Sequence, residues 1–235
     1  MPQLKNFVAV DWRAGKDKIY FFFKDTNTYS RFDIEDNRVI DGHPTTPNAI
    51  NWHDFHPHAK DLRFGFTTTG FKTPEYLGFD SDILWFFYLD GEQPMVCKYD
   101  QDADRVNSFM PLSKSPWSML APYFERIIAG TWRETALRPR GFEFLLNDGS
   151  YLSLDLTSPK HHLVHKEITN DTWPGLEPYK HRMITAVQND RSLADSYYYI
   201  FLTGNQYLRY NLMTFRLLAG PIDVNDGNWP GLLRD

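Results

Sequence analysis

Cysteine is almost missing from this chain of 235 residues: Cys97 is the single one, so no disulfide can form within the molecule. No sign of charge dominates either, because 25 Lys and Arg stand against 30 Asp and Glu, a net charge of −5. The basic surface typical of nucleic-acid binding is therefore not expected. Long hydrophobic runs are lacking too. The longest, residues 83–89, is too short to cross a bilayer, so no membrane span is expected.

Catalytic signatures are also missing. The chain has no His-Glu-x-x-His, no Gly-x-Ser-x-Gly and no glycine-rich phosphate loop before a helix. Ser150, which follows Asp148 and Gly149, is typical of a hairpin turn. The apolar stretch at residues 7–10 is far too short for the core of a signal peptide. The sequence therefore predicts a cytoplasmic protein without enzymatic activity.

What the chain does have is a fourfold repeat. One column of the repeat holds tryptophans that are 65, 56 and 56 residues apart: Trp52, Trp117, Trp173 and Trp229. A second column holds an acid or amide 17 to 19 residues before each tryptophan: Asp33, Asp100, Asp155 and Asn211. A third column holds small residues near the start of each repeat: Ala9, Gly65, Gly130 and Ala186. Three columns in step indicate four copies of one structural unit.

Each repeat predicts three antiparallel strands, and the repeats run over about residues 1–61, 62–126, 127–182 and 183–235. The expected strands are 7–12, 18–24 and 28–34; 62–68, 83–89 and 95–100; 127–133, 141–146 and 151–156; and 183–188, 197–202 and 207–212. Polar and apolar residues alternate in the third strand of each repeat, which is typical of a half-buried strand. Cys97 falls in the apolar column, so we expect a buried structural thiol.

Before each tryptophan the tail of the repeat suits either a short helix or a peripheral strand, and residues 117–126 have helical spacing. Four small sheets leave exposed edges unless they close into a ring. The predicted fold is therefore all-β, a single four-bladed β-propeller with short helical segments at the blade ends.

The repeats resemble hemopexin-like domains over essentially the whole chain. Two segments look like the repeat terminus of that family: Trp173-Pro174-Gly175-Leu176 and Trp229-Pro230-Gly231-Leu232. Residues 198–210 resemble its sequence motif for strands two and three. The resemblance is weaker around Trp52 and Trp117, where the Pro-Gly step is absent. It implies a four-bladed propeller around a narrow channel. Secreted members join the last blade to the first by a disulfide, so here residues 229–233 are expected to pack against the first repeat instead.

The resemblance also implies a cation, Ca²⁺ or Na⁺, held on the axis by backbone carbonyls, with water or chloride in the channel as the alternative. Those carbonyls belong to Val8, Val10, Phe64, Phe66, Ala129, Thr131, Thr185 and Val187. The aspartate that the family often places at the start of the first strand is missing here, which weakens the electrostatic case for the cation.

Two histidine runs are a second candidate site. They consist of His53, His56 and His58, and of His161, His162 and His165. Such runs can bind a transition metal or a haem iron, although neither matches a closed zinc site. Exposed loops that happen to be rich in histidine are the plain alternative.

Aromatic residues near loops favour a third possibility, a carbohydrate-binding defence lectin. Sugars could stack on Tyr76, Tyr123, Tyr179, Trp12 or Trp132, although ordinary packing between blades explains these residues equally well. The predicted partner is therefore a small ligand, a metal ion or a glycan. The sequence determines neither the natural ligand nor the oligomeric state.

Overall fold

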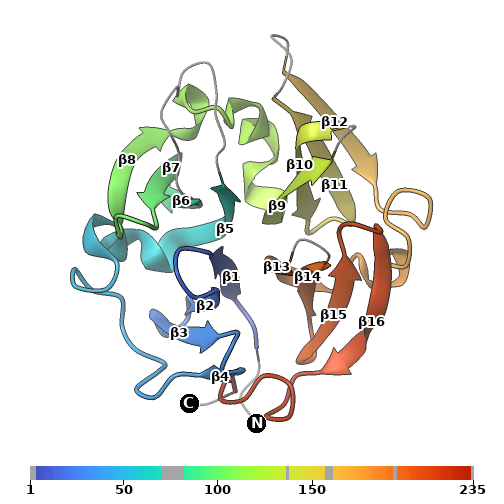
Figure 1. Ribbon diagram of the computed structural model, residues 1–235. Helices are drawn as coiled ribbons and strands as arrows, with labels where there is room; N and C mark the ends of the chain where they lie inside the picture. The colour runs from blue at the N-terminus through green and yellow to red at the C-terminus, as the bar shows by residue number, and fades with distance from the viewer. Residues whose placement is uncertain (1–3, 70–81, 136–137, 157–160, 193–194, 234–235) are drawn as a thin grey trace.

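The computed structural model describes residues 4–69, 82–135, 138–156, 161–192 and 195–233. These residues form four antiparallel sheets of four strands each, arranged in a ring (Figure 1). Blade 1 contains β1 (Phe7–Trp12), β2 (Lys18–Phe23), β3 (Thr28–Asp33) and β4 (Arg38–Val39). Blade 2 contains β5 (Leu62–Thr69), β6 (Asp82–Asp90), β7 (Gln93–Asp100) and β8 (Arg105–Pro111). Blade 3 contains β9 (Ile127–Thr135), β10 (Arg138–Leu146), β11 (Ser150–Asp155) and β12 (His162–Glu167). Blade 4 contains β13 (Met183–Ser192), β14 (Asp195–Leu202), β15 (Gln206–Asn211) and β16 (Arg216–Asp223).

The first strand of every blade lies innermost. Strand β5 contacts β1 and β9, and β13 contacts β1 and β9, so the four first strands surround one axis (Figure 1). Strands β5 and β13, on opposite sides of that axis, also have Cα atoms within 8 Å of each other, so the channel is narrow. The predicted four-bladed β-propeller is confirmed.

The outer strand lies elsewhere than the sequence suggested. It follows the third strand after a short turn, whereas the tails before the tryptophans, residues 44–48, 111–116, 168–172 and 223–228, are mostly turns and loops. The tail of the second repeat contains a short helix at residues 112–114, which was one of the two predicted forms. Outer strands such as β12 are largely exposed and lack a clear apolar column, so the periodic pattern could not locate them. Helical segments are present as 3₁₀ helices: η1 (His53–Asp61), η2 (Leu112–Lys114), η3 (Ser118–Arg126) and η4 (Glu177–Tyr179). No helix among the described residues is long and apolar enough to span a membrane.

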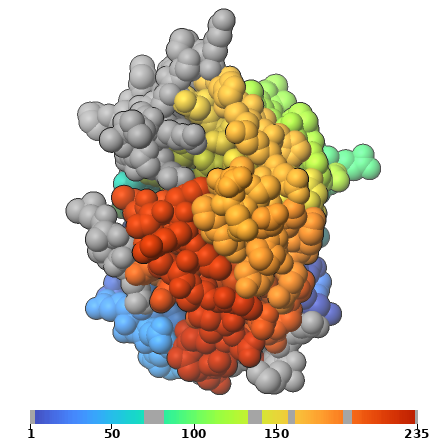
Figure 2. Space-filling model, turned by 90° about the vertical axis from the view of Figure 1, so that its right-hand side faces the viewer, coloured from blue at the N-terminus to red at the C-terminus, as the bar shows by residue number. Residues whose placement is uncertain are grey.

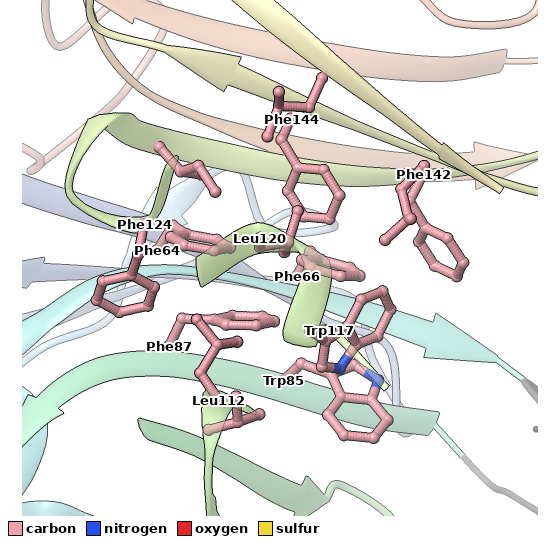
Figure 3. Packing of buried hydrophobic residues seen from close by; sticks show 14 of the residues in the cluster. Phe64, Phe66, Trp85, Phe87, Leu112, Trp117, Leu120, Phe124, Phe142 and Phe144 are labelled. Carbon is pink, nitrogen blue, oxygen red and sulfur yellow. The ribbon is translucent and has the colours of Figure 1, made fainter. Parts of the chain in front are cut away.

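The cores lie between blades, and Figure 3 shows the one between blades 2 and 3. Trp117 is fully buried there, with its ring centroid 5.2 Å from that of Phe66 and 4.8 Å from that of Phe142. The other three tryptophans of the column occupy equivalent places. Each packs on the blade that follows it: Trp52 on Phe86, Trp173 on Tyr210 and Trp229 on Phe32. Four equivalent wedges explain why tryptophan recurs in the repeat.

The small residues of the third column make room for the neighbouring blade. A Cβ atom on Gly65 would lie 2.8 Å from Cγ1 of Val10 and 3.0 Å from the carbonyl oxygen of Trp85. One on Gly130 would lie 2.7 Å from the ring of Phe66. These positions are small because a large residue of the preceding blade fills the space.

The ring closes through its C-terminal segment. Trp229 packs between Phe32 of blade 1 and Phe201 of blade 4, with ring centroids 4.9 Å and 5.3 Å away. The backbone N–H of Val39 in β4 donates to the carbonyl of Pro230 at 2.8 Å. The red C-terminal atoms lie directly against the blue atoms of blade 1 in Figure 2. Closure by apolar packing and hydrogen bonds, expected in place of a disulfide, is confirmed.

Candidate functional site

The backbone groups that face the axis can be read from hydrogen bonds of blade 1. Asn6 faces β2, because its carbonyl accepts from the N–H of Lys24 at 3.1 Å. Successive residues of an antiparallel strand direct their backbone N–H and C=O groups to opposite edges of the strand. The backbone groups of Val8 and Val10 therefore also point to β2, while those of Ala9 and Asp11 point to the axis. The N–H of Ala9 accordingly donates to Oγ1 of Thr185 on β13, at 3.2 Å.

The other blades follow the same register. In blade 2 the N–H of Thr67 donates to Oδ1 of Asp11 at 2.9 Å, so Gly65 and Thr67 are the axis-facing positions. In blade 4 the N–H of Leu212 donates to the carbonyl of Ser196, so the backbone groups of Ser196 point to β15 and those of Tyr199 and Phe201 point to β13. Their partners on β13, Thr185 and Val187, therefore point back to β14 and away from the axis.

The predicted carbonyl ring is therefore displaced by one residue. The carbonyls of its eight members point into the ladder with the second strand: Val8, Val10, Phe64, Phe66, Ala129, Thr131, Thr185 and Val187. The axis-facing carbonyls belong to the positions between them. The resemblance placed these carbonyls on the strands that line the axis, but one residue away from the positions whose backbone groups face it.

Buried polar side chains gather where the first strands end. Asp11 accepts the Thr67 N–H, and its Oδ2 accepts from Nε of Arg13 at 2.9 Å. Gln101 lies across the same junction, where its Nε2 donates to Oγ1 of Thr67 at 2.8 Å and its Oε1 accepts from the N–H of Arg13 at 2.7 Å. These bonds join blades 1 and 2 at one mouth of the channel.

Blades 3 and 4 meet through a second polar group at this mouth. Oγ1 of Thr131 donates to Oε1 of Gln188, and Oγ of Ser153 donates to Oε1 of Glu143 at 3.1 Å. Tyr198 is fully buried nearby, and burial raises the pKa of its hydroxyl well above the ordinary value, with the carboxylates of Asp11 and Glu143 adding to the effect. A neutral phenol is therefore the stable form at physiological pH.

A cleft of about 190 Å³ opens between blades 1 and 4. Apolar residues of blade 1, aromatic residues, three amides and one arginine line it. The lining consists of Ile19, Phe32, Ile34, Asn37, Asn189, Tyr199, Tyr207, Arg209, Asn228 and Trp229. Ile34 and Asn189 also line a smaller cavity beside Asp11 and Arg13, so the cleft adjoins the axial polar residues.

Asn189 stands out within this cleft. Its side chain is 4% exposed, and its Oδ1 has no hydrogen-bond partner among the described residues. A buried amide oxygen without a donor is costly, so a hydroxyl or water that reached this oxygen from the cleft would be stabilised. Sequence reasoning missed Asn189 and Arg209, because neither belongs to a motif. The one available signal was the fourfold column, in which Asn211 replaces an aspartate.

The first histidine run lies on η1 without converging. Nδ1 of His56 is hydrogen-bonded to the carbonyl of His53 at 2.7 Å, and Nε2 of His53 lies 4.0 Å from a carboxylate oxygen of Asp104. The ring of His58 packs instead on Tyr88, with centroids 4.5 Å apart.

The second run lies at and before β12. His162 and His165 are separated by three residues on a strand, so their side chains emerge on opposite faces of the sheet. Nε2 of His165 is 2.8 Å from Oγ of Ser150, and His161 precedes the strand. Among the described residues no group of three or more His, Cys, Asp or Glu side chains has an arrangement that could hold a metal ion.

The remaining candidates have structural roles where the structure describes them. Asp33 pairs with Arg31, and Asp100 and Asn211 accept backbone N–H groups of the turns that follow them. Cys97 is buried, and burial raises the pKa of its thiol well above the ordinary value, as expected for a structural thiol.

The aromatic residues proposed for sugar stacking also pack against other side chains where the structure describes them. Trp12 packs against Trp52 and Tyr99 between blades, and Tyr123 packs on His165. Tyr179 and Trp132 are partly buried against the cores. Tyr76 lies outside the described residues.

No protein-family model matches the chain, and a search of curated proteins finds no match. Solved propellers do resemble it. A catalytically inactive virginiamycin B lyase from Staphylococcus aureus is 10% identical, with 94% of this chain and 57% of that chain covered and a TM-score of 0.30. The WD40 domain of SCAP from fission yeast is 12% identical, with coverages of 88% and 41% and a TM-score of 0.26. The β-propeller domain of Cps50 (Swd1) from Myceliophteria thermophila is 11% identical, with coverages of 90% and 59% and a TM-score of 0.30.

The chain thus spans about two fifths to three fifths of the length of these three propellers. Similarities at this level carry no argument about activity. The fold assignment depends on the chain's own four sheets and their shared axis.

Proposed function

We propose that this protein is a non-catalytic binding propeller of the hemopexin-like type, and that it binds a small carbohydrate in the cleft between blades 1 and 4. The observation that carries this proposal is the cleft itself, which is lined by aromatic rings, amides and one arginine, together with the buried, unpartnered Oδ1 of Asn189. The four tryptophan wedges and the Trp-Pro-Gly-Leu phrases after blades 3 and 4 support the hemopexin-like assignment.

Carbohydrate fits this lining better than a purely apolar ligand. Asn37 and Asn189 offer amide groups to hydroxyl groups, while the Tyr199 ring offers a surface on which a sugar can stack. The amide of Asn228 is bonded within its own turn, to the N–H of Asn225 and the carbonyl of Asp223. The cleft is also smaller than the roughly 300–1,000 Å³ of drug-sized sites, so it suits one monosaccharide unit.

A glycan array followed by NMR titration of the best monosaccharide tests the proposal. We expect Asn189→Ala to weaken binding several-fold, while Asn147→Ala on an exposed turn of blade 3 leaves it unchanged. Binding unaffected by Asn189→Ala, or no binding of any glycan, would refute the carbohydrate proposal.

A second candidate function is ion binding at two places. On the axis, the inward carbonyls in the observed register would supply oxygen ligands for Ca²⁺ or Na⁺. On η1, where the histidines do not converge, His53 and His56 would each bind a transition metal or a haem iron only weakly, as single surface ligands.

Three measurements test ion binding. Adding Ca²⁺ at about 100 times its dissociation constant should stabilise the fold by about 2.7 kcal/mol, reversed by chelator; an unchanged Tm in both conditions would refute an axial Ca²⁺. Retention on immobilised nickel should fall in His53→Ala/His56→Ala but not in His162→Ala. A haemin titration of the same variants separates haem from bare metal, because ligated haem shifts its Soret band.

A further inference from the structure

We propose that the ligand of this cleft carries a carboxylate, which Arg209 binds, so that the preferred sugar is a hexuronate. The inference depends on the proposed function of the cleft and adds the ligand's charge. It follows from a comparison of Arg209 with its counterpart in blade 1.

Arginine occupies the same place in the third strands of blades 1 and 4, with a different residue two positions later. In blade 1, Nε of Arg31 donates to Oδ1 of Asp33 at 2.8 Å, and Nη2 donates to Oδ2 at 3.0 Å. In blade 4 the position of the aspartate holds Asn211, whose Oδ1 accepts the N–H of Thr214 at 2.8 Å. The substitution removes the carboxylate that the repeat provides for this arginine.

The guanidinium of Arg209 therefore lies at the cleft without a carboxylate partner among the described residues. Its one described contact with an aromatic ring is with Tyr197, where Cζ lies 5.4 Å from the centroid. Stacking fixes one face of a guanidinium and leaves the N–H edge available. The positive charge of the cleft thus comes from Arg209, whose guanidinium is held in place by Tyr197.

No acid lines the cleft beside Arg209. The ten lining residues include one cation, three amides and no carboxylate. Of the acids next to its blade 1 residues, Asp33 pairs with Arg31 and Glu35 pairs with Lys16 at 2.9 Å, while Asp36 is exposed and does not line the cleft. An anionic group in the ligand would meet attraction here.

Arg209 and Asn189 together indicate two chemical groups that one ligand should carry. A guanidinium binds a carboxylate with two parallel hydrogen bonds, and the buried Oδ1 of Asn189 needs a donor such as a hydroxyl. A hexuronate carries both groups on one ring, and that ring can lie against Tyr199. A neutral hexose would satisfy Asn189 only, and benzoate would satisfy Arg209 only.

NMR titrations with glucuronate, glucose and benzoate separate these contributions. Glucuronate should bind the unmodified protein at least tenfold more tightly than glucose or benzoate. Arg209→Gln should reduce glucuronate affinity at least tenfold and leave glucose affinity within twofold. Arg216→Gln, on the exposed outer strand β16, is the matched control and should change neither.

Asn211→Asp is a second variant that keeps the arginine. The introduced carboxylate should pair with Arg209 as Asp33 pairs with Arg31, retain the acceptor for Thr214, and weaken glucuronate without weakening glucose. Equal affinities for glucuronate and glucose, or Arg209→Gln without effect, would overturn the charge proposal while the carbohydrate site stands. No binding of any of the three ligands would overturn both.

Discussion

At the scale of single residues, blades 1 and 2 pack closely because Gly65 has no side chain. The space beside Gly65 is filled by Val10 of blade 1 and by the backbone oxygen of Trp85, and a backbone atom cannot move aside cheaply. The sequence identified the column of small residues to which Gly65 belongs. The cause of that column was not visible in the sequence, because a repeat pattern does not show which residues of the neighbouring blade lie against it.

Gly65→Ala is therefore expected to lower the free energy of unfolding by about 1–3 kcal/mol, the usual cost of overpacking. Urea denaturation measures it. In a Val10→Ala background the same substitution should cost less, because one of the two contacts is gone. Strict additivity of the two changes would show that the contact with Val10 is not the cause.

At the scale of elements, the sequence predicted the three inner strands of each blade to within a few residues, because their apolar columns are buried between blades. It could not predict which strand edge faces the axis, since both edges of a strand carry the same backbone groups. Arg209 was overlooked for a related reason. Its proposed role depends on a partner that is missing two residues later, and the one sign of this in the sequence is that Asn211 replaces an aspartate in the fourfold column.

The tryptophan wedges make an element-scale prediction. Trp173→Ala and Trp229→Ala should each cost about 3–5 kcal/mol, because both remove a buried ring between two blades. Thermal and urea unfolding of both variants should give similar losses, with Met213→Ala on the surface as the neutral control. A nearly unchanged stability of Trp229→Ala would mean that the C-terminal segment does not close the ring.

At the scale of the whole molecule, buried tyrosines make the free energy of unfolding decrease at alkaline pH. Burial raises the pKa of Tyr20, Tyr88, Tyr99 and Tyr198 above the ordinary value, and a hydrogen bond to Asp104 adds to the effect at Tyr99. Below about pH 10 these phenols are neutral in both states, so their contribution to stability is complete. Above that pH the unfolded chain loses protons that the folded chain keeps, and stability must fall.

We therefore expect phenolate absorbance and loss of circular dichroism to rise together in one transition well above pH 10. Surface tyrosines should titrate first, without loss of structure. If all the phenols ionised near their ordinary pKa while the fold stayed intact, the tyrosines would not be buried as described.

The central claim is that a ligand enters between the first and last blades, and fluorotryptophan NMR tests it most directly. The chain has seven tryptophans, and Trp229 lines the cleft. With Trp229→Phe used to assign its signal, glucuronate should shift the resonance of Trp229 and leave that of the equivalent wedge, Trp117, in place. A ligand that binds while the Trp229 resonance stays fixed would contradict the account.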